Sequence, residues 1–345
     1  MIYYIQIHDT TIKLVKYINS FHACKKCKIV LPTLARVYLT VGPGNKLFKD
    51  FKAQEVYFQM NLNKISFGTY RIKSPETISL ALDYYSSIDT AQVYKNHFII
   101  SDLLSTESIS NVSSESASNI PIERNQRKRS EYFITTKLSP KAHLNPTESI
   151  RECLNSLKLN YIDLVLIHWP GTQKLSPSDP QNKINRLNTF NALLEAQKQG
   201  LIRHIGVSNY TKQHLLELPV PPFLNQVEFH PLLYTDEFKE LMEYCQSKNI
   251  ILQAYSPLGE GKLLNAIEYP LLQEIATRHE KSIAQILIKW ILDKNVYVVV
   301  KASTKERMME NLNVFDLELS PKDVEYMDSM AISPKKFCWD PSVVL

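Results

Sequence analysis

The stretch Tyr161–Pro170, with the sequence YIDLVLIHWP, decides how the chain is interpreted. Its centre is a short run of branched and other apolar residues, which predicts a β-strand over Ile162–His168. The strand ends in His168, and Trp169 and Pro170 follow it directly. A polar group that can contact a ligand therefore stands where an apolar strand stops.

Seven further runs of this kind occur from residue 56 onwards, and helical patterns lie between them. The additional strands are predicted over Lys64–Phe67, Ser87–Thr90, Tyr132–Lys137, His204–Val207, Leu224–Glu228, Ile251–Ala254 and Tyr297–Val300. Helices are predicted over Pro75–Tyr85, Glu148–Leu157, Leu187–Gly200, Thr235–Lys248, Leu271–His279 and Ser282–Leu292. Ser74 is a favourable N-cap ahead of Pro75, and Gly200 marks a helix end. Strands and helices thus alternate over most of the chain.

Eight strands that alternate with helices indicate a parallel sheet. The span from residue 56 to about residue 330 is close to the ~250 residues of a closed (β/α)₈ barrel, so we predict an α/β fold of the TIM-barrel type. A doubly wound open sheet is the alternative, and it normally carries a G-x-G-x-x-G fingerprint after its first strand. The chain has no such fingerprint and only eight glycines, which favours the barrel.

Residues 1–55 differ from the rest of the chain. They carry nine Lys and Arg against three Asp and Glu, an excess of +6, whereas residues 56–345 sum to −1. A nearly neutral main body argues against a nucleic-acid-binding surface. We expect a poorly ordered N-terminal extension; a mitochondrial presequence is less favoured, because such segments are Arg-rich and Lys dominates here. Cys24 and Cys27 form a lone CxxC pair without the second pair that zinc needs, so no metal site is predicted.

We assign the barrel to residues 56–330. One further segment interrupts its alternation of strands and helices, and a second segment follows it. Residues 105–130 hold a Ser- and Asn-rich stretch and a basic run, which we interpret as a flexible, low-complexity insertion before the third strand. Residues 331–345 form a C-terminal tail near the predicted active-site mouth.

No run approaches ~18 uncharged apolar residues, so no transmembrane helix is predicted. The five scattered cysteines favour a reducing compartment, and we predict a cytoplasmic protein.

Functional residues of a parallel barrel lie just after its strands, around one mouth. Seven of the eight predicted strands end in or near polar residues. These are Asp89 with Tyr94 close behind, Lys137, His168, Ser208 with Asn209, Gln226 with Glu228, Tyr255 with Ser256, and Lys301 with Ser303. Each one alone has an ordinary structural explanation as a solvated or satisfied group. Their convergence on one face predicts an active site.

The residues around these strand ends form motifs that follow one another along the chain. The motifs are Gly68-Thr69-Tyr70, Ile88-Asp89-Thr90-Ala91 with Tyr94 and Asn96, Phe133 to Leu138, Tyr161 to Leu164 with Ile167 to Pro170, Gly206 to Tyr210, Asn225 to Glu228, Ala254 to Gly259, and Lys301 through Arg307 to Asn311. With them the chain resembles the aldo-keto reductase family from about residue 56 to residue 330. The resemblance touches every predicted strand.

The resemblance implies a (β/α)₈ oxidoreductase that reduces aldehydes or ketones to alcohols with NADPH, or with NADH at lower preference. It implies a catalytic tetrad of Asp89, Tyr94, Lys137 and His168. A carbonyl that accepts hydride develops negative charge on its oxygen, so a proton donor must lie beside it, and Tyr94 is the expected acid. A free Tyr has a pKa of about 10, and we expect the Lys137 cation, anchored by Asp89, to lower it. His168 is expected to orient the carbonyl oxygen.

The resemblance also implies a set of cofactor-binding residues. Tyr255 matches the aromatic shelf for the nicotinamide ring, and three polar residues match the groups that hold its carboxamide. Lys301 and Arg307 suit a 2′-phosphate, because an Arg fork matches phosphate geometry, and this favours NADPH. The complete predicted set is Thr69, Tyr70, Asp89, Ser208, Asn209, Gln226, Tyr255, Ser256, Leu258, Lys301, Ser303, Arg307 and Asn311, of which Ser208, Asn209 and Gln226 hold the carboxamide.

A small-molecule carbonyl substrate is expected at the same mouth, in contact with Tyr70, His168, Trp169 and Trp339. A catalytically weak, cofactor-sensing or regulatory barrel is the second hypothesis, and it is less favoured because all four tetrad positions are present. A metal-dependent barrel enzyme would need a clustered set of His and Asp ligands, which the sequence does not offer. The resemblance further implies a monomer or weak dimer, and neither nucleic acid nor membrane is an expected partner.

Overall fold

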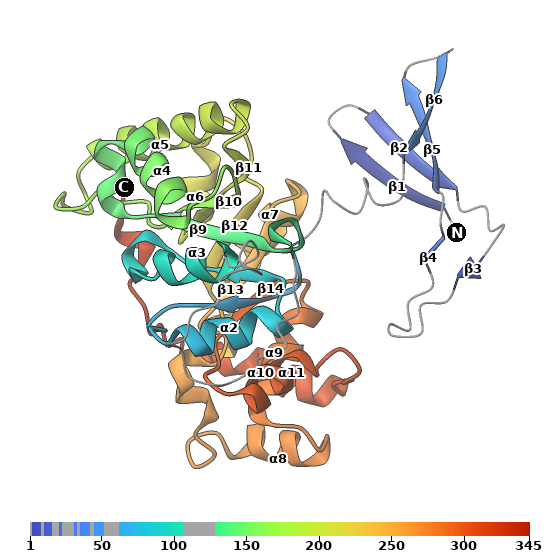
Figure 1. The fold of residues 1–345 in the computed structure, drawn as a ribbon. Helices are drawn as coiled ribbons and strands as arrows, with labels where there is room; N and C mark the ends of the chain where they lie inside the picture. Colours follow the sequence, from blue (N-terminus) through green and yellow to red (C-terminus); the bar gives the residue numbers. More distant parts are fainter. Residues whose placement is uncertain are drawn as a thin grey trace, which may run out of the picture. The chain divides into compact units, whose positions relative to one another are not determined.

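The computed structural model describes residues 62–105 and 128–345 and, before residue 62, the backbone of six strands. The chain divides into two compact units, Met1–Asn61 and Leu62–Leu345, and each is described by itself (Figure 1). Sequence analysis instead places the end of the N-terminal extension at residue 55. The serine-rich part of the predicted insertion, residues 106–127, and the CxxC pair of Cys24 and Cys27 lie outside the described residues.

The first unit contains a four-stranded antiparallel sheet and a short strand pair. The sheet has the order β1-β2-β5-β6, and β3 pairs with β4. The strands are β1 (Ile2–Ile7), β2 (Thr10–Val15), β3 (Phe21–His22), β4 (Leu31–Pro32), β5 (Ala35–Val41) and β6 (Asn45–Phe51). The sequence predicts none of them, because residues 1–55 show no sustained alternation of apolar and polar residues.

The second unit is a closed barrel of eight parallel strands, and it confirms the predicted (β/α)₈ fold. Around the barrel the strands follow the order β7 to β14, and β14 pairs with β7 to close it. Their bounds are β7 (Ile65–Gly68), β8 (Ser87–Asp89), β9 (Phe133–Leu138), β10 (Ile162–Ile167), β11 (Ile202–Ser208), β12 (Leu224–Glu228), β13 (Ile251–Tyr255) and β14 (Tyr297–Val300).

Helices surround the barrel on the outside (Figure 1). They are α2 (Pro75–Tyr84), α3 (His97–Ser105), α4 (Pro146–Leu157), α5 (Gln181–Lys198), α6 (Lys212–Leu216), α7 (Asp236–Ser247), α8 (Pro270–Arg278), α9 (Ile283–Asp293), α10 (Lys305–Leu312) and α11 (Pro321–Ser329). The predicted cap of α2 is present, since Ser74 Oγ accepts from the Thr77 N–H at 3.1 Å. Gly200 has a φ of +75°, the left-handed conformation that glycine tolerates at a helix end. No helix within the described residues is long and apolar enough to cross a membrane.

Strand β10 is buried on both faces. All six residues of β10 are buried, and alternate side chains enter two different apolar clusters. Val165 and Ile167 belong to the large core, whereas Leu164 and Leu166 belong to a smaller cluster. A strand covered on both sides is mostly apolar, which explains the run that follows Asp163. The Asp163 carboxylate itself is paired with Arg129 and Arg203. Gly206 on β11 makes room for this packing, because a Cβ there would lie 2.4 Å from Leu166 Cδ2.

The residues that flank 106–127 lie at the end of the barrel where the strands begin. Near the end of α3, Asp102 pairs with Lys158, which caps the end of α4, at 2.9 Å. On the other side, Arg129 in the 3-10 helix η3 (Arg129–Glu131) pairs with Asp163 at the start of β10, at 2.6 Å. The chain therefore leaves and re-enters the barrel on the face opposite to the mouth.

Candidate active site

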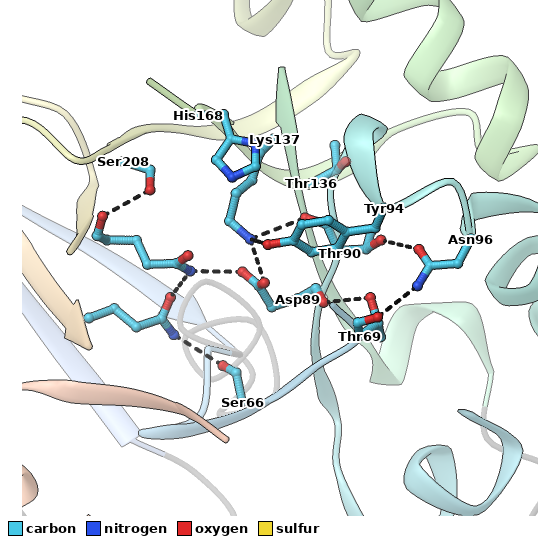
Figure 2. A network of polar contacts seen from close by, with 12 residues as sticks. Ser66, Thr69, Asp89, Thr90, Tyr94, Asn96, Thr136, Lys137, His168 and Ser208 are labelled. Carbon is cyan, nitrogen blue, oxygen red and sulfur yellow. Dashed lines mark hydrogen bonds and ion pairs between the residues drawn. The ribbon is translucent and has the colours of Figure 1, made fainter. Parts of the chain in front are cut away.

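The carboxyl ends of the barrel strands bring the predicted polar residues together at one mouth. Figure 2 shows Asp89 from β8, Lys137 from β9, His168 directly after β10 and Ser208 at the end of β11. The parallel register sets Ser208 opposite Gln226 on β12. Neighbouring parallel strands end side by side, so residues that are far apart in the sequence become neighbours here.

Lys137 lies at the centre of this group, and its side chain is only 1% exposed. Its Nζ donates to Asp89 Oδ1 at 2.5 Å, to the Tyr94 hydroxyl at 3.2 Å and to the Thr90 carbonyl at 3.3 Å. Tyr94 is the last residue of the 3-10 helix η1 (Gln92–Tyr94), which follows β8. An ammonium has three hydrogens, so all are used, and one is directed at the phenol oxygen.

The charge states of this group follow from its burial. Burial acts to lower the pKa of Lys137, but Asp89 and Tyr94 raise it, and the net direction is upwards, so the ammonium stays charged. Burial raises the pKa of Tyr94, and the Lys137 cation opposes the rise without overcoming it. Lys137 thus acts on the pKa of Tyr94 in the expected, lowering direction, but desolvation of the phenolate outweighs the attraction of the cation and the net direction is upwards. Tyr94 is a protonated phenol in the neutral pH range.

His168 packs against Tyr94, and their ring centroids lie 6.0 Å apart in an edge-to-face arrangement. Burial, and next the Lys137 cation, lowers the pKa of His168 to about 3. The imidazole is therefore neutral at ordinary pH, and a neutral imidazole offers one N–H donor and one acceptor nitrogen. His168 can donate a hydrogen bond to a ligand oxygen without adding a positive charge.

A second polar group lies beside the first and contains the residues predicted to face a carboxamide. The Tyr255 hydroxyl donates to Asn209 Oδ1 at 2.7 Å. Asn209 Nδ2 donates to the His168 carbonyl at 3.0 Å and to Ser208 Oγ at 3.1 Å. Ser208 Oγ in turn donates to the Gln226 carbonyl at 2.9 Å. The side chains of Tyr255, Asn209 and Ser208 are thus fixed in place by one another and by two backbone carbonyls.

Gln226 joins the two groups through its side-chain amide. Its Nε2 donates to Asp89 Oδ2 and to Gln253 Oε1, both at 2.8 Å. Gln253 Nε2 then donates to Ser66 Oγ at 3.2 Å, and all of these residues are buried. Because the Asp89 carboxylate can only accept, it fixes the orientation of both amides. Gln226 therefore donates to both of its neighbours, Gln253 donates onward to Ser66, and Gln226 Oε1 is left as an acceptor.

Sequence analysis missed Ser66 and Gln253 as parts of the site. Both lie inside predicted strands instead of at their ends, so the search for polar residues at strand ends passes over them. A polar side chain inside an otherwise apolar strand of a barrel was the available signal, since an interior polar group needs a hydrogen-bond partner. The two residues support Gln226 from the interior of the barrel.

Thr69, predicted as a cofactor-binding residue, is a buried link between two loops. Its Oγ1 donates to the Asp89 carbonyl at 2.9 Å, and its own carbonyl accepts from Asn96 Nδ2 at 2.9 Å. Asn96 Oδ1 also accepts from Thr90 Oγ1 at 2.8 Å. These bonds, visible in Figure 2, tie the loop after β7 to the loop that carries Tyr94.

The residues predicted to bind the adenosine end form a separate, outer group. Lys301, Ser303 and Arg307 are exposed on the loop after β14 and on the first turn of α10. Thr304 caps this helix, since its Oγ1 accepts from the Arg307 N–H at 3.4 Å. The N-terminus of α10 and two cationic side chains thus lie together on one exposed edge.

Lys301 links this outer group to the mouth, whereas Asn311 lies apart from the group. Lys301 Nζ lies 5.9 Å from the ring centroid of Tyr70, whose ring centroid is 5.0 Å from that of Tyr94, so the outer group reaches the mouth. Asn311 is buried and hydrogen-bonds the Tyr85 side chain. The structure therefore places Asn311 on the buried face of α10, apart from the exposed cations.

The residues predicted to contact the substrate border the mouth. The rings of Trp169 and Trp339 meet edge to face with centroids 6.1 Å apart, and Trp339 is 79% exposed. Tyr70 is also largely exposed. After β13, Ser256 takes a left-handed conformation with a φ of 50°, and Leu258 follows it in a partly buried position. Apolar and aromatic side chains thus surround the polar centre.

A closed parallel barrel that gathers Asp, Lys, Tyr and His side chains at one mouth defines a (β/α)₈-barrel enzyme. The model of the Aldo/keto reductase family matches residues 64–332. The chain belongs to this family and is thereby an oxidoreductase that acts on carbonyl groups. Members of the family typically use nicotinamide cofactors.

Known proteins with related sequences and structures agree with this assignment. The chain is 34% identical over 281 residues to a glyoxal reductase of Bacillus subtilis, covering 79% of this chain and 88% of the relative. It is 32% identical over 269 residues to a methylglyoxal reductase of Yersinia pestis, covering 76% and 86%. A crystal structure of an aldo-keto reductase from a deep-sea metagenome library of the Medee basin matches with a TM-score of 0.66 and 32% identity, covering 81% of this chain and 95% of that one.

Proposed function

We propose that the chain reduces small aldehydes and ketones with NADPH and that Tyr94 is the proton donor. The observation that carries the proposal is the buried Lys137 ammonium, held 2.5 Å from Asp89 Oδ1 and 3.2 Å from the Tyr94 hydroxyl. The neutral His168 beside them completes the set. Relatives that are named as reductases of glyoxal and methylglyoxal make small aldehydes the first substrates to test.

Each residue of the tetrad has a distinct role in the proposed reaction. A bound nicotinamide cofactor supplies the hydride. As negative charge develops on the carbonyl oxygen, Tyr94 donates its proton to that oxygen, and the Lys137 ammonium stabilises the phenolate left behind. Asp89 keeps Lys137 charged within a buried site. His168 donates a hydrogen bond to the same oxygen and orients it.

The second polar group fits the carboxamide of a nicotinamide. Gln226 uses both amide hydrogens inside the protein, so its Oε1 is an acceptor for a carboxamide N–H. Ser208 and Asn209 are immobilised beside it, and Tyr255 is anchored through its hydroxyl. A rigid set of polar groups next to an aromatic ring supports cofactor binding at this part of the mouth.

The preference for the phosphorylated cofactor rests on Lys301 and Arg307. Neither side chain forms an ion pair within the described residues 62–105 and 128–345. Lys301 lies on the loop that leads to the capped helix α10, and Arg307 lies on its first turn. A helix N-terminus and a guanidinium fork both favour a phosphate group. We therefore place the 2′-phosphate of NADPH here, with Ser303 as a further donor, and expect NADH to bind more weakly.

The proposal is tested with the full-length protein, NADPH and a panel of carbonyl compounds that includes glyoxal and methylglyoxal. We expect turnover by the wild type and a loss of about 10² to 10⁴ in the Tyr94→Phe variant, because general acid catalysis contributes that much. Binding of NADPH, followed by cofactor fluorescence, should be unchanged in the variant. Normal turnover by Tyr94→Phe would remove Tyr94 from the role of acid.

The alternative, a cofactor-sensing or regulatory barrel with little catalysis, makes the opposite prediction for the same panel. Tight NADPH binding without turnover of any carbonyl compound would favour it. Location in the cytoplasm and a monomeric or weakly dimeric state remain predictions from the sequence. Sedimentation velocity of the purified protein measures the oligomeric state directly.

A further inference from the structure

Glu228, the last residue of β12, has a buried carboxylate that the proposed reaction does not use. Its Oε1 accepts from the Phe337 backbone N–H at 2.7 Å, and its Oε2 accepts from the Cys338 backbone N–H at 3.2 Å. Lys336 Nζ lies 3.2 Å from Oε2, and His230 Nε2 lies 3.3 Å from Oε1. Three of these four donors come from consecutive residues of the C-terminal tail.

These contacts make the ionised form of Glu228 and the position of the tail depend on each other. Burial by itself would raise the pKa of Glu228, but the donors from His230, Phe337 and Lys336 lower it below its ordinary value. If the tail moved away, the carboxylate would lose two backbone N–H donors and a cation while it stayed inside the barrel wall. Only His230 would then remain as a partner, and a buried charge that has lost most of its partners is costly, so the carboxylate holds the tail in place.

The tail beyond these contacts has little packing beneath it. Trp339 is 79% exposed, and a cavity of about 940 Å³ lies between the tail and the helices α6 and α7. Apart from the ring contact of Trp339 with Trp169, the next attachment comes at the end of the tail. There His214 Nε2 lies 2.9 Å from the Val344 carbonyl, and the Leu345 N–H donates to the Pro177 carbonyl at 2.9 Å. The segment between Cys338 and Val344 is therefore held mainly at its two ends, and Glu228 provides the attachment nearer to the mouth.

The attachment at Glu228 sets what the tail presents to the mouth. The Phe337 ring lies against Gly259, where a Cβ would come within 2.8 Å of Phe337 Cε2, and Gly259 has a φ of +56°. Gly259 belongs to the loop after β13 that is proposed to contact the cofactor. Cys338 Sγ lies 4.0 Å from Ser256 Oγ in the same loop, and Trp339 reaches Trp169. One carboxylate thus fixes the residues that border both parts of the mouth.

We propose that Glu228 is a positioning residue that holds the C-terminal tail across the mouth and thereby shapes the substrate side of the site. The kinetic part of this inference rests on the proposed function. The structural part does not, because it concerns only the attachment of the tail. Glu228 acts through residues 336–339 and not on the reacting atoms.

The Glu228→Gln variant tests the attachment directly. An amide places N–H hydrogens against one of the backbone N–H donors and lacks the charge that holds Lys336, so the tail should detach more often. Limited trypsin digestion, followed by mass spectrometry, should release residues 337–345 roughly tenfold faster than from the wild type, as expected for the loss of a charge-assisted hydrogen bond. An unchanged release rate would overturn the proposal.

Enzyme kinetics separate positioning from general damage. We expect the KM for a bulky aldehyde to rise roughly tenfold in Glu228→Gln, while kcat and the KM for NADPH change less than about twofold. Glu237→Gln is the matched control, because Glu237 borders the same cavity on α7 and makes no hydrogen bond to the tail within the described residues. A rise in the KM for NADPH equal to the rise for the aldehyde would contradict a role on the substrate side.

A second variant guards against misfolding. Glu228→Gln combined with Lys336→Met also removes the cation that the single substitution leaves without a partner, and Lys335 remains as an exposed trypsin site. This double variant should show the same faster cleavage, now after residue 335. If the wild type turns over no carbonyl compound at all, the proposed function fails while the digestion result still decides whether Glu228 holds the tail.

Discussion

At the scale of single residues, Gln253 shows how a side chain outside the predicted tetrad supports it. Its Oε1 accepts from Gln226, and its Nε2 donates to Ser66. The negative charge on Asp89 fixes the direction of these bonds, so each amide presents a defined edge to the next. In a buried chain of this kind, removal of one member leaves its neighbours with unsatisfied groups, and the cost exceeds that of one bond.

We predict that Gln253→Met weakens cofactor binding more than it slows the chemical step. Methionine fills a similar volume but cannot accept from Gln226, so the Gln226 amide loses the partner that keeps its Oε1 available to the cofactor. The KM for NADPH should rise about threefold to tenfold, the effect of roughly 0.5–1.5 kcal/mol for one hydrogen bond. Steady-state kinetics with varied NADPH measure it.

The control for this prediction is another buried glutamine remote from the mouth. Gln285 completes the cap of α9 and donates to the Asn313 carbonyl at 2.7 Å. Gln285→Met should lower the melting temperature without raising the KM for NADPH. Equal changes in the KM for NADPH in both variants would show that Gln253 has only a general structural role.

At the scale of elements, His97 joins three of them on the outside of the barrel wall. It begins α3, its Nδ1 lies 2.8 Å from Ser156 Oγ on α4, and its Nε2 lies 3.0 Å from Thr136 Oγ1 on β9. Burial, and next the Lys137 cation, lowers the pKa of His97 to about 4, against 6.5 for an ordinary histidine. The native protein therefore holds this imidazole neutral where the unfolded chain would protonate it.

The sign of the resulting pH dependence follows from proton binding. Between pH 6.5 and about 4 the unfolded state binds more protons than the native state at this position. The contribution of His97 to stability is thus complete above the unfolded pKa and is lost as the pH falls, by about 2 kcal/mol at pH ~5.

Urea unfolding near pH 7.5 and near pH 5 measures this loss. The His97→Gln variant cannot titrate, so we expect its stability to fall by about 2 kcal/mol less than that of the wild type over the same pH interval. The change in the free energy of unfolding between the two pH values is compared for the wild type and the variant. Contributions from the other histidines are the same in both proteins and cancel. The same fall in both proteins would assign the acid sensitivity to other groups.

The elements also show which parts of the fold are readable from the sequence. Strand β14 is found at its predicted bounds, because a strand buried on both faces appears as a short apolar run. Strand β12 is also found at its predicted bounds, although Asn225, Gln226 and Glu228 in it are polar. Helix α5 begins at Gln181, six residues before the predicted Leu187. Its first turns are polar and are held by long-range contacts, such as that of Arg186 with Glu217 at 2.6 Å, which no periodicity reveals.

The same division applies to the site. Lys137 and His168 could be predicted because each one ends a strand, and a parallel barrel brings strand ends together. Glu228 also ends a strand, but its role depends on backbone N–H groups more than 100 residues later in the chain. The upward direction of the Tyr94 pKa required knowledge of burial, which depends on the packing of the whole mouth. Sequence pattern thus predicts which residues converge, and the folded structure determines their charge states.

At the scale of the whole molecule, the distribution of charge follows the division into two units. Residues 1–61 carry an excess of six positive charges, and residues 62–345 sum to −1. Every barrel strand, every cap and every predicted site residue lies in the second unit. The chain enters the barrel at β7 from the face where the strands begin, which is opposite to the mouth.

We therefore predict that residues 62–345, preceded by a methionine, fold and catalyse without the first unit. The barrel is closed by the pairing of β14 with β7, in which the Val298 N–H donates to the Lys64 carbonyl at 2.7 Å and no earlier residue takes part, and the buried Leu62 stays in the chain. Thermal unfolding followed by circular dichroism, and turnover of the best carbonyl substrate, should match those of the full-length protein within a few degrees and about twofold. The truncated protein should also lose retention on a cation exchanger, because the positive excess is removed. A truncated barrel that melts far lower would show that the first unit contributes to the fold. Loss of turnover while NADPH still binds would show that the first unit contributes to the mouth. Equal retention of both proteins would show that the positive charge of the first unit is not accessible.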